Sequence, residues 1–414
     1  MAAIKPADLQ AETSGAIART EITDIHTHLF TPQFGSLLLW GIDDLLTYHY
    51  LVAETFRWIN LPYQEFWQMP QQAQAGLIWR TLFVEHSPVS EACRGVLTVL
   101  DALGLDVSKR DLNSYRGYFA ECTTDAYLDR VLKISGVSHM VMTNDPFVPE
   151  EYAVWKQGYT EDPRFSTALR MDTLLNNWPG GCRALRDWGY NVDVDAAAAT
   201  KAEVRRFLSD WIGRMRPLYL AVSLPPTFNW PEESPRSWLL ADCVLPVAAD
   251  HGLPLAMMIG VKKLVNPELR LAGDSEAKAA IEPVENLCAA YPGNKFLLTM
   301  LARENQHEAC VAARKFRNLF PFGCWWFMNN PLLINELTRM RLELLGLSHV
   351  PQHSDARVLD QLIYKWAHFR PILAGVLTDK YADLLRTGWV VTREEIERDV
   401  RGLLGENFWA FLRR

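Results

Sequence analysis

The chain has 414 residues, of which 49% are hydrophobic, 22% charged and 11% aromatic, which is the balance of an ordinary globular protein. The formal net charge of -7, without a long run of Lys or Arg, argues against nucleic acid and anionic membrane as partners, and no apolar run is long enough to span a bilayer. Seven cysteines without CxxC spacing, and charges throughout residues 1–20, predict a cytoplasmic protein with reduced thiols and no signal peptide.

The first predicted strand, EITDIHTH at 21–28, ends in two histidines separated by one residue. Side chains two residues apart in a strand point to the same face, so His26 and His28 would lie side by side, as metal ligands do. The alternative is structural, with one imidazole at the strand end in water and the other filling a polar gap in the core. The pair alone does not decide between them, because short His-x-His matches also arise by chance.

A segment of about a hundred residues, 29–130, separates this strand from the next, and such a length must have structure of its own. Its pattern predicts helices over 41–58, 71–83 and 90–105, with Ser90 as the N-cap of the third. The segment follows the C-terminal end of a strand, which is where α/β barrels carry their active sites. We therefore expect a helical insertion that contributes to the site.

Short β-rich segments alternate with helical segments along the rest of the chain. The strand candidates number eight and lie at 21–28, 137–146, 165–172, 218–225, 253–260, 295–301, 319–327 and 347–355. The alternation predicts parallel strands with right-handed crossovers, and eight units favour a closed (β/α)8 barrel that forms a single domain over 1–414. A doubly wound open sheet is the alternative, but no Gly-rich dinucleotide fingerprint follows the first strand.

Two predicted helices end the chain, at 360–388 and 392–414. Thr392 is followed three residues later by Glu395, which is a capping-box pattern. The second helix is therefore predicted to begin directly after Thr392.

A third ligand for a metal at His26 and His28 would have to come from another strand end. The best candidate is Asp355 in PQHSDARV, because the eighth strand of a closed barrel is the neighbour of the first. Two imidazoles, a carboxylate and an open position are typical of catalytic zinc sites. The alternative makes Asp355 a helix N-cap with Arg357 as its surface partner.

Several motifs carry a resemblance to a known family. DIHTHLF on the first strand and SDAR on the eighth resemble the amidohydrolase superfamily of metal-dependent barrels. TYHYLVAE and LIWRTLFVEHSPVSEACRGVLTVL in the insertion, with ALRMD and GCWWFMNNP further on, resemble uronate isomerases, also called glucuronate isomerases. The similarity runs from about residue 20 to the C-terminus. The combination of motifs is far more specific than the His-x-His pair.

The resemblance implies a metal site with a tyrosine above it. His26, His28 and Asp355 would bind one divalent metal, with Zn²⁺ expected, and Asp355 would also handle protons as a catalytic group. Tyr50, from the insertion, would contact the sugar near the reacting carbons as a further catalytic group. The proton would be carried by Asp355, Tyr50 or a metal-bound water, and the sequence does not decide which of them is the base.

The resemblance also implies four substrate contacts further along the chain. Arg357, which would take part in catalysis, and Arg170 would hold the substrate carboxylate or hydroxyls, since a guanidinium fork matches a carboxylate. Trp325 and Trp326 would offer an indole to the apolar face of the sugar.

The implied activity is the aldose–ketose isomerisation of D-glucuronate to D-fructuronate, and of D-galacturonate to D-tagaturonate, through a cis-enediol. The expected partners are a small uronic acid and, because large aromatics suit subunit contacts, further copies of the chain in a homo-oligomer. One departure concerns the fifth strand, where the superfamily often has a histidine and this chain has Met258 and Ile259. This predicts a site with few protein ligands. A metal-dependent hydrolase and an inactive sugar-acid-binding relative are the alternatives.

Overall fold

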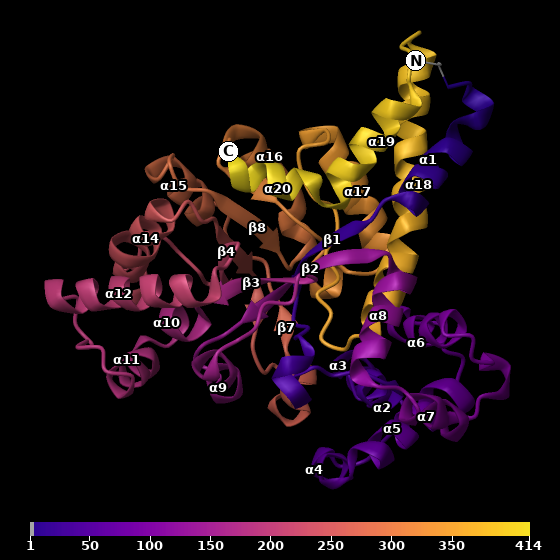
Figure 1. Ribbon diagram of the computed structural model, residues 1–414, viewed down its shortest axis with the longest axis horizontal. Helices are drawn as coiled ribbons and strands as arrows, with labels where there is room; N and C mark the ends of the chain where they lie inside the picture. Colours follow the sequence, from indigo (N-terminus) through magenta and orange to yellow (C-terminus); the bar gives the residue numbers. More distant parts are fainter. Residues whose placement is uncertain (1–3) are drawn as a thin grey trace.

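A curved sheet of parallel strands forms the centre of the protein in the computed structural model (Figure 1). The model describes residues 4–414, and residues 1–3 of the charged N-terminal stretch lie outside the described residues. Within residues 4–414 the sheet has seven strands in the order β1-β2-β3-β4-β5-β8-β9. Their bounds are Ile22–Thr27 (β1), Val137–Asn144 (β2), Phe165–Arg170 (β3), Tyr219–Leu224 (β4), Leu255–Ile259 (β5), Phe296–Met300 (β8) and Leu319–Pro321 (β9). Each lies within a predicted range, which confirms the first seven strand candidates and the parallel α/β class.

The eighth candidate, 347–355, is an extended segment and not a regular strand. It pairs through an isolated parallel bridge between Val350 and Phe322, the residue after β9. Further along, the amide of Asp355 donates to the carbonyl of His26 on β1. The segment thus lies between β9 and β1, where the barrel prediction places it. A regular ladder does not form, because the proline after Val350 has no N–H and Asp355 has a left-handed backbone (φ 53°).

The described chain between β1 and β2 forms seven α-helices, where three helices were predicted. They are α2 (Ile42–Leu46), α3 (His49–Thr55), α4 (Tyr63–Gln68), α5 (Gln71–Trp79), α6 (Glu91–Ala102), α7 (Leu112–Ala120) and α8 (Thr124–Ser135). The predicted helix at 41–58 is divided into α2 and α3, because Tyr48 has an extended backbone. The N-cap prediction is confirmed, since the hydroxyl of Ser90 accepts from the amide of Cys93 at the start of α6.

The remaining helices lie before, between and after the strands along the chain. They are α1 (Leu9–Arg19), α9 (Pro149–Gln157), α10 (Asp172–Asn176), α11 (Trp178–Asp187), α12 (Ala198–Met215), α13 (Pro235–Trp238), α14 (Leu245–Asp250), α15 (Glu282–Ala290), α16 (Gln306–Lys315), α17 (Pro331–Leu345), α18 (Gln361–Arg386), α19 (Arg393–Arg401) and α20 (Asn407–Arg413). The capping box of Thr392 and Glu395 is present at the start of α19. The predicted helix at 392–414 is interrupted between α19 and α20, where Gly405 has a φ of 149°. No helix among the described residues combines the length and the apolar character needed to cross a membrane.

Two parts of the chain meet at the C-terminal end of the strands. A small hairpin, β6 (Val261–Lys262) and β7 (Ser275–Glu276), follows β5 and is joined by a 3-10 segment, Pro267–Gly273. The indole of Trp67, in α4 of the insertion, donates to the carbonyl of Glu268 in this segment (2.8 Å). The hairpin and the insertion lie on the same side of the sheet in Figure 1 and together cover the strand ends.

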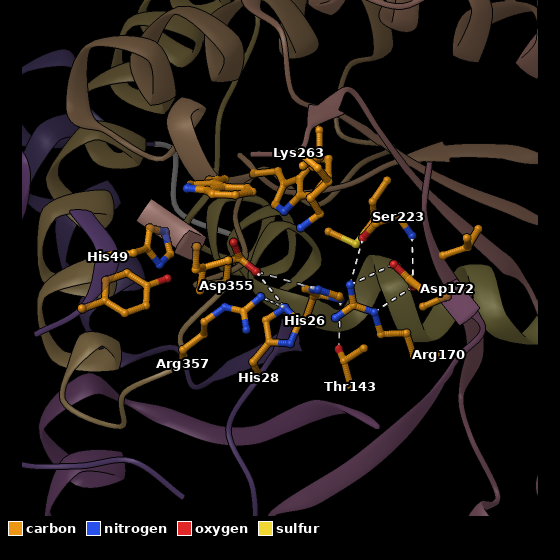
Figure 2. A pocket seen from close by; sticks show the side chains of 18 residues that line it. His26, His28, His49, Thr143, Arg170, Asp172, Ser223, Lys263, Asp355 and Arg357 are labelled. Atoms are coloured by element: carbon orange, nitrogen blue, oxygen red, sulfur yellow. Dashed lines mark hydrogen bonds and ion pairs between the residues drawn. The ribbon is translucent and has the colours of Figure 1, made fainter. Parts of the chain in front are cut away.

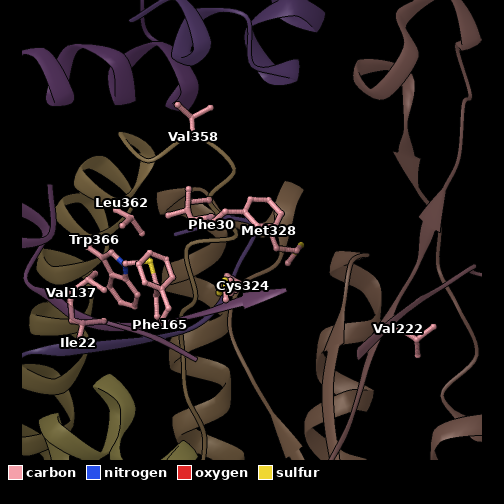
Figure 3. Close-up of a cluster of buried hydrophobic side chains, with 14 of the residues drawn as sticks. Ile22, Phe30, Val137, Phe165, Val222, Cys324, Met328, Val358, Leu362 and Trp366 are labelled. Atoms are coloured by element: carbon pink, nitrogen blue, oxygen red, sulfur yellow. The ribbon is translucent and has the colours of Figure 1, made fainter. Parts of the chain in front are cut away.

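The hydrophobic core has two parts, one on each face of the curved sheet. The larger part lies between the strands and the surrounding helices, and Figure 3 shows Ile22, Val137 and Trp366 within it. The smaller part fills the inside of the curve and includes Ile25 and Tyr219. Burial on both faces explains why the strands read as continuous apolar runs, as is typical of parallel sheets.

Candidate active site

Three predicted ligands come together at the C-terminal end of β1 (Figure 2). His26 lies at the end of β1 and His28 directly after it, and Asp355 lies next to them on the neighbouring extended segment. The Oδ1 atom of Asp355 lies 3.9 Å from Nε2 of His26 and 3.5 Å from Nε2 of His28. One ligand atom from each residue lies within 4.8 Å of the other two. This is the spacing of side chains that share one cation.

The hydrogen bonds behind His26 set its tautomer. The hydroxyl of Tyr219 donates to the carbonyl of Ile25 (2.8 Å) and lies 3.0 Å from Nδ1 of His26. Because that hydroxyl has only one proton to give, Nδ1 of His26 carries the proton and donates. Nε2, which faces Asp355, therefore has a free lone pair, as a metal-binding imidazole requires.

Burial keeps both imidazoles neutral. It lowers the pKa of His26 to about 3, with the neighbouring His28 adding to the effect. Burial and the charge of Arg357 hold the pKa of His28 well below its ordinary value. Neutral imidazole is the form that binds metal, so the pair needs no deprotonation at neutral pH.

The donor set fits a divalent cation. Among residues 4–414, buried Nε2 of His26 and buried Oδ1 of Asp355 have no hydrogen-bond partner. Buried polar atoms are seldom left unpaired, and these two face each other across the cluster. A cation bound between them would satisfy both atoms, and two nitrogens with one carboxylate oxygen suit zinc or a similar divalent metal.

The cluster forms one wall of a small cavity of about 30 Å³. The cavity is lined by His26, His28, Tyr48, His49, Thr143, Arg170, Asp172, Ala221, Val222, Ser223, Met258, Val261, Lys263, Leu271, Trp325, Trp326, Asp355 and Arg357. A chamber of about 600 Å³ adjoins it and shares His28, Arg170 and Arg357 as lining residues. A sugar-sized molecule thus has room next to the three predicted ligands.

The two predicted arginines both line the cavity but differ in their partners. Arg170, at the end of β3, forms two hydrogen bonds to the carboxylate of Asp172 (2.8 and 3.0 Å) and one to the hydroxyl of Ser223 (3.3 Å). Arg357 has no carboxylate within 4.0 Å in the described chain, and its Nη2 lies 3.5 Å from Nε2 of His28. Arg357 is therefore the arginine whose charge is available to an anionic ligand.

Of the three predicted aromatic residues, two line the cavity. Trp325 and Trp326, in the loop after β9, line the cavity as expected. Tyr50 does not line it. The ring of Tyr50 packs against those of Tyr48 and His49, with centroids 4.9 and 4.5 Å away. The structure thus adds these two neighbours to the cavity wall, and the contact of Tyr50 with a sugar stays a prediction.

Sequence reasoning missed Tyr48 and His49, although both stand in the TYHY run. Their exposure to the cavity depends on where α3 begins, because the first helical residue, His49, fixes the direction of each following side chain. Thr143 and Ser223 were also missed. Their signal was their place at the C-terminal ends of the second and fourth strands, β2 and β4.

Two carboxyl groups lie on the chamber wall beside Arg170. Glu151, on α9, accepts from the amide of Asp145 (2.9 Å) and from the side chain of Asn144 (3.2 Å). Burial raises the pKa of Glu151 to about 7 and that of Asp145 to about 6. Protonated carboxyls are therefore present at the chamber in mildly acid solution.

We expect Glu151→Gln to stabilise the protein increasingly as the pH rises. A carboxyl with a raised folded-state pKa contributes stability below its unfolded pKa, and this contribution is lost as the pH rises through about 7. The difference in free energy of unfolding between variant and wild type should grow by about 3 kcal/mol from pH 4 to pH 8, measured by urea unfolding. Glu150→Gln, at the exposed neighbour, should give no such trend. A difference for Glu151→Gln that does not change with pH would contradict the prediction.

Gly323, in the GCWWFMNNP motif, allows His353 to pack beneath the site. It has a φ of 64°, and a Cβ at this position would lie 1.6 Å from Nδ1 of His353. The ring of His353 in turn lies 5.3 Å from that of His26. Only glycine is compatible with both the backbone and this contact.

Gly323→Ala is accordingly expected to lower the free energy of unfolding by about 3 kcal/mol or more, because backbone strain and overpacking add. Urea unfolding followed by tryptophan fluorescence measures the change. Gly76→Ala is the matched control, since a Cβ at Gly76 in α5 meets no atom within 4 Å. That variant should be as stable as wild type or slightly more stable. Equal stability of the two variants would refute the packing argument.

The known proteins that resemble this chain were found among solved structures. No protein-family model and no curated protein sequence matches it. A uronate isomerase from Bacillus halodurans C-125 is 56% identical over 100% of this chain and 98% of that one, with a TM-score of 0.98. A glucuronate isomerase from Caulobacter crescentus is 14% identical over 99% and 94% of the two chains, with a TM-score of 0.79. A protein assigned as a metal-dependent hydrolase, from Lactobacillus casei ATCC 334, is 13% identical over 97% of both chains, with a TM-score of 0.56.

Proposed function

The chain belongs to the uronate isomerase family, and we propose on this basis that it converts D-glucuronate to D-fructuronate, and D-galacturonate to D-tagaturonate. The observation that carries the proposal is the juxtaposition of a His-His-Asp cluster with an unpaired arginine in one small cavity. A uronate has a carboxylate for the arginine and oxygens on its reacting carbons for the cluster. We also propose that the enzyme acts in the cytosol, where its seven unpaired cysteines would stay reduced.

Aldose–ketose isomerisation moves a proton from C2 to C1 through a cis-enediol, so the site needs a base, an acid and stabilisation of oxyanion charge. We propose His26, His28 and Asp355 as the ligands of one Zn²⁺, which would polarise a substrate oxygen as a Lewis acid. The carboxylate of Asp355 is the basic group in the cluster and would hold the proton between C2 and C1. The neutral imidazoles would keep their lone pairs for the cation.

The remaining residues of the cavity would orient the sugar. The fork of Arg357 matches a carboxylate, whereas Arg170, already paired with Asp172, would place its remaining N–H groups on sugar hydroxyls. The indole faces of Trp325 and Trp326 would cover the apolar side of the sugar chain. These four contacts together would exclude water from the reacting carbons.

Incubation of the purified protein with D-glucuronate in D₂O tests the proposal. We expect the signal of the ketose D-fructuronate to appear and the C2 proton to exchange with solvent, both dependent on a divalent metal. Prior treatment with a chelator should abolish both signals, and added Zn²⁺ should restore them. Neither ketose nor exchange in the presence of metal would contradict the proposed activity. A parallel panel of esters, lactones and amides then tests metal-dependent hydrolysis.

A further inference from the structure

Two residues of the cavity wall have a backbone conformation that non-glycine residues seldom adopt. Trp326 has a φ of 47° and Asp355 has a φ of 53°. Left-handed backbone is unfavourable at such residues and persists only where the surroundings hold it in place. The two residues lie in different segments, so contacts from other residues must hold the backbone of each segment in this conformation.

Asn329, in the GCWWFMNNP motif, is bonded to both segments. Its amide donates to the carbonyl of Trp326 (2.9 Å). Its side-chain Nδ2 donates to the carbonyls of His353 (3.1 Å) and Ser354 (3.3 Å), the two residues before Asp355. One buried side chain therefore links the tryptophan loop to the backbone that precedes the predicted metal ligand.

The orientation of the Asn329 side chain is itself fixed. Its Oδ1 accepts from Nε2 of Gln352 (2.9 Å), so both ends of the amide are used. The ammonium of Lys365, on α18, donates to the backbone carbonyl of Asn329 (3.2 Å). A residue with this many bonds in a buried position can hold strained neighbours without moving.

A second contact secures the other side of the same backbone. The carboxylate of Asp24, on β1, accepts from the amide of Ser354 (3.1 Å) and from the indole of Trp366 (3.0 Å). Ser354 is therefore held through its amide by β1 and through its carbonyl by Asn329. Asp355 therefore follows a residue whose amide and carbonyl are both held by hydrogen bonds.

We propose that Asn329 is a positioning residue that keeps the carboxylate of Asp355 aimed at His26 and His28. The inference rests on the proposed function in one respect, which is that Asp355 is a metal ligand. It assigns no contact with the substrate to Asn329. Partners that orient metal ligands typically change metal affinity or activity by about 10- to 100-fold when they are lost.

Asn329→Asp is the decisive variant, because a carboxylate has the same shape but cannot donate to the carbonyls of His353 and Ser354. Asn330→Asp is the matched control. Asn330 bonds the same loop through the carbonyl of Phe327 (3.0 Å), and its Oδ1 caps α17 by accepting from the amide of Leu333, which aspartate does equally well. The two variants thus place the same chemical change on adjacent residues.

We expect Asn329→Asp to raise the dissociation constant of Zn²⁺ at least tenfold, measured by competition with a fluorescent chelator. Its kcat with D-glucuronate should fall at least tenfold while KM changes less than threefold. The visible spectrum of the Co²⁺-loaded variant should differ from that of wild type, because the ligand geometry has changed. Asn330→Asp should match wild type in all three measurements.

Unchanged Zn²⁺ affinity and an unchanged Co²⁺ spectrum in Asn329→Asp would overturn the proposal. A rise in KM with normal kcat would also overturn it, because the effect would then lie on Trp325 and Trp326 and not on Asp355. If Asn329→Asp does not fold, Gln352→Met removes the bond that orients Asn329 and should weaken Zn²⁺ binding about threefold; wild-type affinity would overturn the proposal. If wild type binds Zn²⁺ but forms no ketose, the proposed function fails, and the metal measurements still decide the role of Asn329.

Discussion

Replacement of Asp355 by asparagine is expected to slow the isomerisation of D-glucuronate at least about a thousandfold while the fold persists. Asp355 supplies the carboxylate of the cluster, 3.5 Å from the imidazole of His28. An amide neither contributes negative charge to a divalent cation nor accepts a proton from carbon. The variant therefore loses a metal ligand and the proposed base in a single change.

Asparagine is the right replacement because of the backbone. Asp355 has a φ of 53°, and asparagine tolerates this left-handed conformation better than alanine does. The variant should therefore fold, and the lost rate should report chemistry. Asp399→Asn is the control, since Asp399 is as buried as Asp355 (8% and 9% exposed) but is bonded to Tyr381, on α18.

Ketose formation gives the rate, and elemental analysis gives the metal content. Asp399→Asn should keep the wild-type rate even if its thermal midpoint changes. Asp355→Asn should contain less metal than wild type and stay slow when metal is supplied in excess. A rate within tenfold of wild type would remove Asp355 from the mechanism.

The strands and the pair of His26 and His28 could be predicted because their signals are local. Parallel strands buried on both faces read as short apolar runs, and the position of His26 and His28 at the end of one such run places them at the C-terminal edge. Asp355 followed from closure of the barrel. The irregular backbone around Asp355 did not follow, because it depends on bonds from Asn329 and Asp24, which are distant in sequence.

The insertion was harder to predict because its helices are short and held by tertiary contacts. Amphipathic spacing indicated helices but not the break at Tyr48, and that break decides which side chains of the TYHY run face the cavity. The likeness to uronate isomerases pointed to Tyr50. The structure adds Tyr48 and His49, which line the cavity wall and contact the ring of Tyr50, while the role of Tyr50 stays a prediction.

The difference between the two arginines could be seen only in the structure, which shows the partners of their side chains. From the sequence, both Arg170 and Arg357 were expected to hold the substrate carboxylate or hydroxyls. In the structure, Asp172 neutralises Arg170, whereas Arg357 has no carboxylate partner within the described residues. Two arginines of one cavity thus differ in the charge that they offer to a ligand.

We therefore expect Arg357→Met to lower kcat/KM for D-glucuronate about a hundredfold or more. A buried carboxylate that loses its charged partner costs about 2–5 kcal/mol, and 1.4 kcal/mol corresponds to a factor of ten. Arg357→Lys keeps the charge but loses the planar fork, so its loss should be intermediate. Arg339→Met is the control, because Arg339 pairs with Asp379 at the surface (2.7 Å). Its kcat/KM should equal that of wild type.

Two inhibitors, one with a carboxylate and one without, test whether Arg357 binds the substrate carboxylate or acts at the reacting carbons. L-Gulonate, the C1 alcohol of D-glucuronate, keeps the carboxylate, whereas D-glucitol has lost it. Wild type should bind L-gulonate far more tightly, and Arg357→Met should reduce this preference to a few-fold, because the guanidinium that distinguishes the two is gone. If the variant loses the same factor for both inhibitors, Arg357 does not bind the carboxylate. A preserved preference would move that role to Arg170, whose pairing with Asp172 would then have to open on binding.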